Sequence, residues 1–553
     1  MELEIPEPLA LALQNLVGAK SALGHELGPQ GTGRGTRVVS SRHFDGDALT
    51  MLYGLGQRSG ERDLVFQLLA LDNLNGESLL RPIASLELLV PAIVEWLARD
   101  LIDGWLYQRG RDGAMLAWLV HSVRHVQPTD GKAYVVVGLL ANTLQAAGRE
   151  PPSDPRLRFS GMTWGLSFYA EDLPGRTVAG LFGDHGFYKE CPEFKRDYEA
   201  HVERFTSLQA QFGAQFTIGG TAWRANVANP RAGLECVRLP AGRAPRCVND
   251  EELLARRFDL AADPCWWREQ GIASGFDHIP QHGYLHLFHL DWHAHVWVHA
   301  QNVQPYAYQP VLRERLVLPQ AHRDLIDILT ADRNFLVEDV VPGKSGGTTI
   351  LCRGAPGLGK TLTAEVYAEV VAKPLYRVHS GQLGVTASSV EASLTTILQR
   401  AARWDCVLLL DEADVYIRRR DNDLQHNAIV AEFLRTLEYF SGLLFMTTNR
   451  ADDIDDAILS RCIAVIDYQP PGRDDACRLW STLAAQLGIE LPEALRDRLV
   501  TDYAGVSGRD IKELLKLTAK YCRRKGIALS AAAFAQCAVF RGLAGPSRPE
   551  SAT

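Results

Sequence analysis

One short run constrains the fold of this chain more than any other feature. Residues 348–363 read TTILCRGAPGLGKTLT, so that Gly354 to Thr361 fill the pattern GxxxxGK[ST] between a β-like run and a helical run. Glycines let the backbone curl so that successive N–H groups point at a phosphate, and the dipole of the following helix adds to this attraction. The pattern in this context predicts a phosphate-binding loop within an α/β domain. The alternative, a glycine-rich turn before a helix, does not explain the Lys-Thr pair.

The residues of this loop have separate expected roles. Lys360 is expected to reach the β- and γ-phosphate oxygens of ATP, and the Thr361 hydroxyl is expected to bind Mg²⁺. ATP and Mg²⁺ are therefore the predicted cofactors. The predicted nucleotide-binding residues are Gly354, Ala355, Pro356, Gly357, Leu358, Gly359, Lys360, Thr361 and Leu362.

A second apolar strand run, residues 406–410, ends in the acidic pair Asp411 and Glu412. Ligands of parallel sheets bind at the carboxyl ends of the strands, so this pair is expected beside the loop. Asp411 is predicted to share the Mg²⁺ with Thr361, and Glu412 to polarise the attacking water. An acidic helix start after a strand is the alternative. The letters Asp-Glu-Ala-Asp also suggest a helicase, but the helicase companion motifs do not follow.

Three more polar positions follow in order. Asn449 ends the apolar run 443–448, Arg461 ends a short predicted helix, and Arg509 begins a helix near the C-terminus. The amide of Asn449 can orient the water between Glu412 and the γ-phosphate.

This ordered set resembles the AAA family of ring ATPases, within the AAA+ superfamily, over about residues 310–545. The resemblance implies ATP hydrolysis, a large α/β subdomain, a helical lid and a ring, usually of six subunits. It also implies that Asn449 is the first sensor, that Arg461 is the arginine finger reaching the neighbouring subunit, and that Arg509 is the second sensor. The predicted catalytic residues are thus Glu412, Asn449, Arg461 and Arg509.

The chain is similar to a poorly characterised group of AAA proteins that carry a strand-rich region directly before the ATPase. Members that thread a polypeptide through the ring place an aromatic residue in the loop after the second strand. Here that loop, His379 to Glu391, contains no aromatic residue. A gating motion of the preceding region is therefore the favoured way of transmitting work.

The rest of the chain predicts a multidomain architecture. The expected parts are a mostly helical region at 1–152, a strand-rich α+β domain at 153–310, the large α/β subdomain at 311–470, the lid at 471–545 and a tail at 546–553. Apolar residues at three- and four-residue spacing predict helices over 61–74, 85–106 and 114–126. Aromatic-rich runs predict strands over 163–169, 215–223, 284–290 and 295–300, the last two as one hairpin. Helices are also expected over 192–212 and 320–329.

Seven of the 16 histidines fall between His278 and His299, a stretch that overlaps the predicted hairpin. A zinc site is one interpretation. No cysteine or glutamate falls among them at ligand spacing, and His286 and His289 are expected on opposite strand faces. Packing against Trp292 and Trp297 is the favoured interpretation.

Composition limits the class of protein. The 553 residues carry 58 basic and 66 acidic side chains, a net charge of −8, which argues against a protein built mainly to bind nucleic acid. No apolar run approaches the roughly 18 to 20 residues that span a bilayer. The ten cysteines are scattered and the N-terminus lacks the pattern of a signal peptide, so a cytoplasmic location is expected.

Three functions remain open from the sequence. The first is ATP-driven remodelling of a protein partner recruited by residues 1–310, with the chain acting as a homo-oligomer, by preference a hexameric ring. The second is a nucleic-acid-dependent motor or loader, and the third is a scaffold whose assembly is switched by nucleotide. The sequence names no protein substrate.

Overall fold

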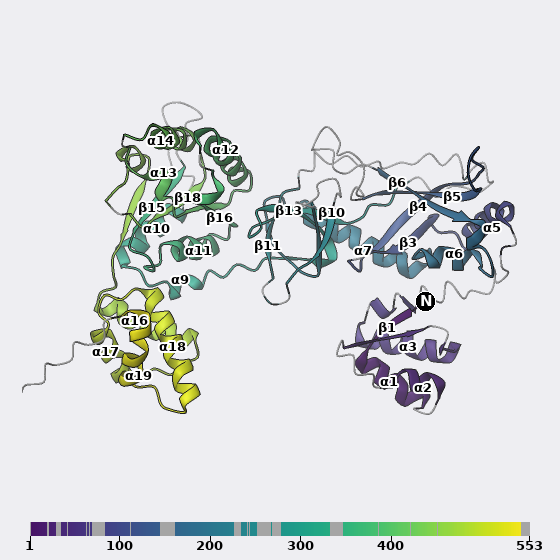
Figure 1. Cartoon of the computed structure of the whole chain (residues 1–553), viewed down its shortest axis with the longest axis horizontal. Helices are drawn as coiled ribbons and strands as arrows, with labels where there is room; N and C mark the ends of the chain where they lie inside the picture. Colours follow the sequence, from purple (N-terminus) through teal and green to yellow (C-terminus); the bar gives the residue numbers. More distant parts are fainter. Residues whose placement is uncertain are drawn as a thin grey trace, which may run out of the picture.

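The computed structural model describes residues 2–18, 21–28, 35–40, 43–61, 63–65, 67–68, 83, 85–110, 112–143, 161–225, 234–240, 242, 244–251, 267, 278–331, 347–384, 386–420, 422–438, 440–450 and 452–543. The chain is multidomain: a parallel α/β domain is followed by a helical unit and preceded by two antiparallel sheets and a small N-terminal unit (Figure 1). Within the described helices, none has both the length and the apolar character needed to cross a membrane.

The α/β domain is built on a five-stranded sheet in the order β16-β17-β18-β15-β19. Its strands are β15 (Thr348–Gly354), β16 (Leu375–His379), β17 (Val407–Asp411), β18 (Leu443–Thr448) and β19 (Ala464–Tyr468). Each pairing is parallel, so the carboxyl ends of the strands meet at one edge of the sheet. The predicted alternation of strands and helices over this region is confirmed.

Helices cover both faces of this sheet. Successive side chains of a strand point to opposite faces, and in β17 Leu408 and Leu410 pack with α12 and α14, whereas Val407 and Leu409 pack with α10 and α11. A strand covered on both faces is apolar at every position, which explains the unbroken run before Asp411. The helices of the domain are α10 (Gln320–Ala331), α11 (Lys360–Val370), α12 (Ala387–Arg403), α13 (Asp414–Ile417), α14 (Leu424–Leu437) and α15 (Asp456–Leu459), with the 3₁₀ turn η7 (Ser380–Gln382).

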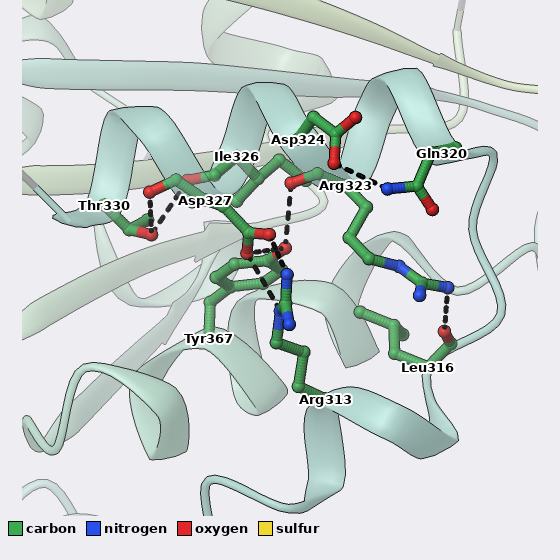
Figure 2. Close-up of polar contacts among 9 residues, drawn as sticks. All are labelled: Arg313, Leu316, Gln320, Arg323, Asp324, Ile326, Asp327, Thr330 and Tyr367. Carbon is green, nitrogen blue, oxygen red and sulfur yellow. Dashed lines mark hydrogen bonds and ion pairs between the residues drawn. The ribbon is translucent and has the colours of Figure 1, made fainter.

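The connecting helix predicted over residues 320–329 is α10, and it is anchored on α11, the helix that follows the phosphate loop (Figure 2). The Tyr367 hydroxyl of α11 donates a hydrogen bond of 2.9 Å to Asp327 Oδ1 of α10. Arg313, from the short helix α9 (Leu312–Arg315), pairs with the same carboxylate. These contacts join α9 and α10 to the helix that follows the glycine-rich loop.

The predicted lid is helical throughout its described part, which ends at residue 543. It consists of α16 (Arg473–Gln486), α17 (Glu493–Asp502), α18 (Gly508–Lys525), α19 (Ala531–Ala538) and the 3₁₀ turn η8 (Val539–Arg541). The helices pack around Trp480, Leu514 and Phe534, which are fully buried. The predicted tail at 546–553 lies outside the described residues.

A seven-stranded antiparallel sheet precedes the α/β domain, in the order β10-β9-β13-β12-β11-β8-β14. Its strands are β8 (Gln215–Ile218), β9 (Thr221–Ala225), β10 (Leu234–Arg238), β11 (Arg246–Asn249), β12 (Tyr284–His289), β13 (Ala294–His299) and β14 (Val303–Pro305), with η5 (Ala300–Asn302) before β14. The predicted hairpin is confirmed as β12–β13. The single strand predicted over 215–223 is instead two strands, which are separated by Gly219 and Gly220.

A five-stranded antiparallel sheet lies before it in the chain, in the order β6-β5-β4-β3-β7. Its strands are β3 (Trp105–Arg109), β4 (Met115–Val126), β5 (Tyr134–Asn142), β6 (Gly161–Tyr169) and β7 (Phe187–Lys189). The associated helices are α5 (Leu86–Ala98), η3 (Ala170–Asp172), α6 (Val178–Asp184) and α7 (Pro192–Gln209). The predicted strand at 163–169 and the predicted helix at 192–212 are both present.

The structure corrects the helical prediction for the N-terminal region. Residues 114–126, predicted as a helix, form strand β4, and the helix predicted over 85–106 ends at Ala98, before strand β3. The first six residues of β4 are all buried, and a short apolar run buried on both sides does not distinguish a strand from a helix by its period. Because β5 and β6 pair within one sheet, the predicted boundary at residue 152 divides that sheet.

The N-terminal unit pairs β1 (Glu2–Pro6) with β2 (Thr36–Ser40) beside α1 (Glu7–Val17), α2 (Ala22–Glu26) and α3 (Gly46–Ser59). Leu3, Leu13 and Leu52 are at its core. The helix predicted over residues 61–74 lies partly outside the described residues, which there include 63–65 and 67–68 in helical conformation.

Candidate functional site

The glycine-rich loop lies between β15 and α11, and its glycines are required by their backbone angles and, at two of the three positions, also by space. Gly354, Gly357 and Gly359 have φ values of 141°, 81° and 100°. A Cβ atom on Gly354 would lie 2.3 Å from the carbonyl oxygen of Tyr468, and one on Gly357 would lie 2.7 Å from Ser507 Oγ. Only glycine fits these positions, and the loop therefore keeps the open curl of backbone that the sequence predicted.

Lys360 is the first residue of α11 and its ammonium group points back into the loop. Its Nζ donates hydrogen bonds to the carbonyl oxygens of Gly354 and Ala355, at 2.7 and 2.8 Å, and to Asn449 Oδ1 at 2.9 Å. Burial lowers the pKa of Lys360, and the carboxylate of Asp414 acts in the opposite direction. The structure thus brings Lys360 and Asn449 into direct contact across two strand ends.

Asp411, the last residue of β17, is buried beside the same loop. Its Oδ1 accepts hydrogen bonds from the hydroxyls of Thr361, at 2.9 Å, and Thr447, at 2.6 Å, and its Oδ2 lies 2.5 Å from Arg377 Nη2. Burial acts to raise the pKa of Asp411, but the two hydroxyl hydrogen bonds and the Arg377 charge hold it below its usual value. The carboxylate is therefore ionised at neutral pH.

Glu412 follows Asp411 in a backbone conformation that residues other than glycine rarely adopt. Its φ is +55°, a left-handed value that costs of order 1–3 kcal/mol and persists only where the surroundings fix it. The Glu412 N–H donates to Thr447 Oγ1 at 3.0 Å, and the following Ala413 N–H donates to the Thr447 carbonyl oxygen. The result is a side chain that is exposed at the strand edge while its backbone is held.

Asp414 and Thr448 are site residues that the sequence analysis missed. Asp414 Oδ1 accepts hydrogen bonds from the Thr448 hydroxyl and from the backbone N–H of Asn449, the latter at 3.1 Å. Together they fix the chain at Asn449. The sequence did carry a signal for these residues. Thr447 and Thr448 are polar residues at the end of an apolar strand run, as Asp411 and Glu412 are at the end of another.

The two predicted arginines lie in different surroundings. The backbone N–H of Arg509, in the first turn of α18, donates to the carbonyl oxygen of Gly357 at 3.3 Å, which brings the lid to the phosphate loop. Arg461 does not lie among the residues that contact the phosphate loop or Asp411. Its guanidinium contacts the Ala457 carbonyl oxygen at 3.2 Å and Glu438 at 3.8 Å.

The residues at this edge fit a magnesium ion bound together with a nucleotide. The donor set is a hydroxyl, Thr361, in contact with an ionised carboxylate, Asp411, and hard oxygen donors are the ligands that Mg²⁺ prefers. Few protein ligands are needed, because Mg²⁺ usually retains waters and takes further oxygens from phosphates.

The histidines of the β12–β13 hairpin pack against each other and against tryptophans. His286 stacks on His295, with ring centroids 4.4 Å apart, and His289 stacks on Trp292 at 4.1 Å. Among the residues that the structure describes, no group of three or more His, Cys, Asp or Glu side chains is arranged to hold a metal ion. This arrangement agrees with the packing interpretation and gives zinc no support.

The fold and this site define a P-loop nucleotide-binding domain with a helical lid. The model of the family described as "ATPase family associated with various cellular activities (AAA)" matches residues 350–469. These residues form an AAA ATPase domain, as the ordered motifs predicted.

Known proteins are similar to this chain over parts of their length. An uncharacterised AAA family ATPase, y4kL of Sinorhizobium fredii, is 34% identical over 128 residues, which are 21% of this chain and 38% of that protein. The ATP-dependent zinc metalloprotease FtsH 3 of Sphaerobacter thermophilus is 28% identical over 210 residues, 36% of this chain and 43% of that protein. The chain thus spans less than half the length of these relatives.

Among solved structures, the AAA domain of FIGL-1 in complex with ADP matches with a TM-score of 0.35 and 19% sequence identity. That match covers 43% of this chain and 86% of the other.

Proposed function

We propose that this protein binds ATP with Mg²⁺ at the edge of the parallel sheet and hydrolyses it to remodel a protein partner. The observation that carries the proposal is the meeting of four motif residues from two strand ends and one helix. Thr361 contacts Asp411, and Lys360 contacts Asn449, although these residues are far apart in the sequence.

In this proposal each side chain has one task. Lys360 and the loop N–H groups bind the phosphates, and Thr361 and Asp411 hold the Mg²⁺, which neutralises phosphate charge when bound. Glu412 accepts a proton from the attacking water, and its held backbone keeps the carboxylate aimed from the strand edge. Asn449, fixed through Asp414, orients that water.

We further propose that the active form is a ring of identical subunits, with six subunits favoured. Arg461 supports this, because its contacts are to Glu438 and Ala457 and not to the loop of its own subunit. A guanidinium at that position can serve as an arginine finger only by entering the site of a neighbour. Arg509 has a different role as the second sensor, since its backbone already touches Gly357 of its own subunit.

The strand-rich region contacts the α/β domain at several places, and two hydrogen bonds among these contacts support transmission of work to it. Asp250, directly after β11, accepts a hydrogen bond of 2.8 Å from Trp404 Nε1 at the end of α12. Tyr306, just after β14, donates one of 2.6 Å to Glu369 of α11. Because α11 begins at Lys360, a shift of this helix on nucleotide binding would reach the sheet of β8 to β14 directly.

The test of hydrolysis compares two variants of the full chain. Lys360→Ala should lose nucleotide binding, whereas Glu412→Gln should bind ATP and fail to turn it over. Equilibrium binding of a fluorescent ATP analogue and phosphate release are the measurements. Normal turnover in Glu412→Gln would overturn the assignment of the general base.

The test of remodelling uses Glu412→Gln as a trap, because an ATP-bound subunit that cannot hydrolyse should retain its partner. Proteins captured with ATP but not with ADP are candidates, and each is then assayed for ATP-dependent change in its structure or assembly. Lys360→Ala, captured in parallel, is the control for binding without nucleotide. Stimulation of ATPase activity by DNA or RNA, with no protein captured, would favour the nucleic-acid alternative instead.

A further inference from the structure

A positive side chain lies on the carboxylate that a bound metal would use. Arg377 is on β16, which pairs with β17, and its Nη2 is 2.5 Å from Asp411 Oδ2. Its Nη1 is 3.5 Å from Glu365 Oε1 of α11. The other oxygen of Asp411 accepts the hydroxyls of Thr361 and Thr447. A guanidinium therefore pairs with the Asp411 oxygen that the two hydroxyls leave free.

The backbone that carries Arg377 is held firmly on its other face. The neighbouring Tyr376 is buried and packs against Trp404 and Phe288, with ring centroids 5.4 and 5.6 Å away, and its hydroxyl accepts a hydrogen bond from Arg400. Adjacent strand residues point to opposite faces, so this packing directs Arg377 toward α11 and Asp411. The charge is placed by the sheet and not by a mobile loop.

We propose that Arg377 is a positioning residue that holds Asp411 and sets how strongly nucleotide binding depends on Mg²⁺. This inference rests on the proposed function. A guanidinium stays charged at any working pH, so it neutralises the carboxylate before any metal arrives. It thereby reduces the repulsion between Asp411 and the phosphates of a metal-free nucleotide, and it also reduces the attraction of Asp411 for Mg²⁺.

The expected size of this effect follows from the exposure of the pair. The Arg377 side chain is 41% exposed, whereas that of Asp411 is 6% exposed, so solvent screens the pair in part. Removal of this partly screened charge is then expected to change the affinity for a nucleotide by about tenfold, and not by many orders of magnitude.

The experiment measures the dissociation constant of a fluorescent ADP analogue for the full chain, once in excess Mg²⁺ and once in excess EDTA. The quantity of interest is the ratio of the EDTA value to the Mg²⁺ value. Arg377→Gln keeps hydrogen-bond donors but removes the charge, and it should raise this ratio about tenfold, mainly by weakening binding in EDTA. Arg377→Lys keeps the charge and should leave the ratio within about threefold of the unaltered protein.

Two further variants separate this charge effect from damage to the fold. Arg435→Met removes an arginine that pairs with Glu391 and Glu432 away from Asp411, and it should leave the ratio unchanged. Glu365→Gln removes a half-exposed negative charge beside Arg377 and should lower the ratio, which is a prediction that stands even if Arg377→Gln misfolds. Circular dichroism of each variant checks folding.

Equal ratios in the unaltered protein, Arg377→Gln and Glu365→Gln would overturn the inference while leaving ATP binding intact. Absence of nucleotide binding by the unaltered protein in both conditions would overturn the proposed function itself. These two failures are distinguished by the same titrations.

Discussion

The α/β domain and the end of β11 in the seven-stranded sheet each carry an aspartate that is buried, paired with an arginine and hydrogen-bonded to two other side chains. Asp411 interacts with Thr361, Thr447 and Arg377, and Asp250 interacts with His295, Trp404 and Arg403. In both, burial acts to raise the pKa, and the surrounding hydrogen bonds and arginine charge lower it below the usual value.

The two sites differ in what else is present. Asp411 ends a parallel strand beside the glycine-rich loop, and the next residue, Glu412, is exposed with a strained backbone. Asp250 is enclosed by the packed side chains of Trp404 and His295, where the seven-stranded sheet meets the end of α12. A perturbed pKa therefore does not identify a reaction site by itself. The open edge of the parallel sheet identifies the reaction site, because a ligand can reach it.

The largest effect is expected on the rate of ATP hydrolysis at the site of Asp411 and Glu412. Glu412→Gln should lower the rate of ATP hydrolysis about 10³-fold, since the amide cannot accept the proton of the attacking water. Nucleotide affinity should change little. The matched control is Asp250→Asn, which alters a buried carboxylate of the other region and should leave the rate per folded molecule close to normal. A comparable loss in both variants would remove the distinction between the regions.

Arg461 should give the next largest effect. Arg461→Ala is expected to lower turnover about 10²-fold, the usual loss of one charged stabilising group, without weakening nucleotide binding to its own subunit. Mixing it with Glu412→Gln should restore part of the activity, because some interfaces then join an intact general base to an intact finger. Specific activity that stays constant on dilution below the dissociation of any oligomer would contradict a role in a neighbouring site.

Replacing Asp250, the aspartate with a structural role, is expected to lower the free energy of unfolding. Asp250→Ala removes the acceptor of the buried Trp404 N–H and the pairing with the partly exposed Arg403, which together should cost about 2 kcal/mol in the free energy of unfolding. Denaturant unfolding followed by tryptophan fluorescence measures this. Asp453→Ala, which removes an exposed ion pair with Arg450, should cost less than about 0.5 kcal/mol. Equal losses would show that Asp250 is not a structural anchor.

The smallest effect concerns pH. The pKa of Asp250 is lower in the folded protein than in the unfolded chain, where it is about 3.9. Ionised Asp250 therefore stabilises the fold fully at pH values above about 3.9. This stabilisation is lost as the pH falls through the lower folded-state pKa. Asp250→Asn should therefore unfold with a shallower dependence on pH below about 4 than the unaltered protein. Unfolding curves at several pH values check this, and an unchanged acid slope would contradict it.

Much of the α/β domain was predictable because its local signals agree with one another. The turn of Gly354 to Gly359, the buried run before Asp411 and the run before Asn449 each carry a short-range pattern typical of a parallel α/β sheet, and the structure pairs these strands in parallel. In the five-stranded antiparallel sheet the same reasoning was wrong. Strand β4 is buried on both sides, so its apolar run has no period of two, and the sequence alone did not distinguish it from a helix.

The sequence by itself thus determined the phosphate loop, the acidic pair and the order of strands and helices around them, because each depends on residues close together in the chain. Only the tertiary structure decided that Arg377 lies on Asp411, that Asp414 fixes Asn449 and that Asp250 joins the strand-rich sheet to α12. These contacts connect side chains distant in sequence, and their partners are set by strand order and register. No local pattern of residues encodes such pairings, whereas the packing of whole sheets does.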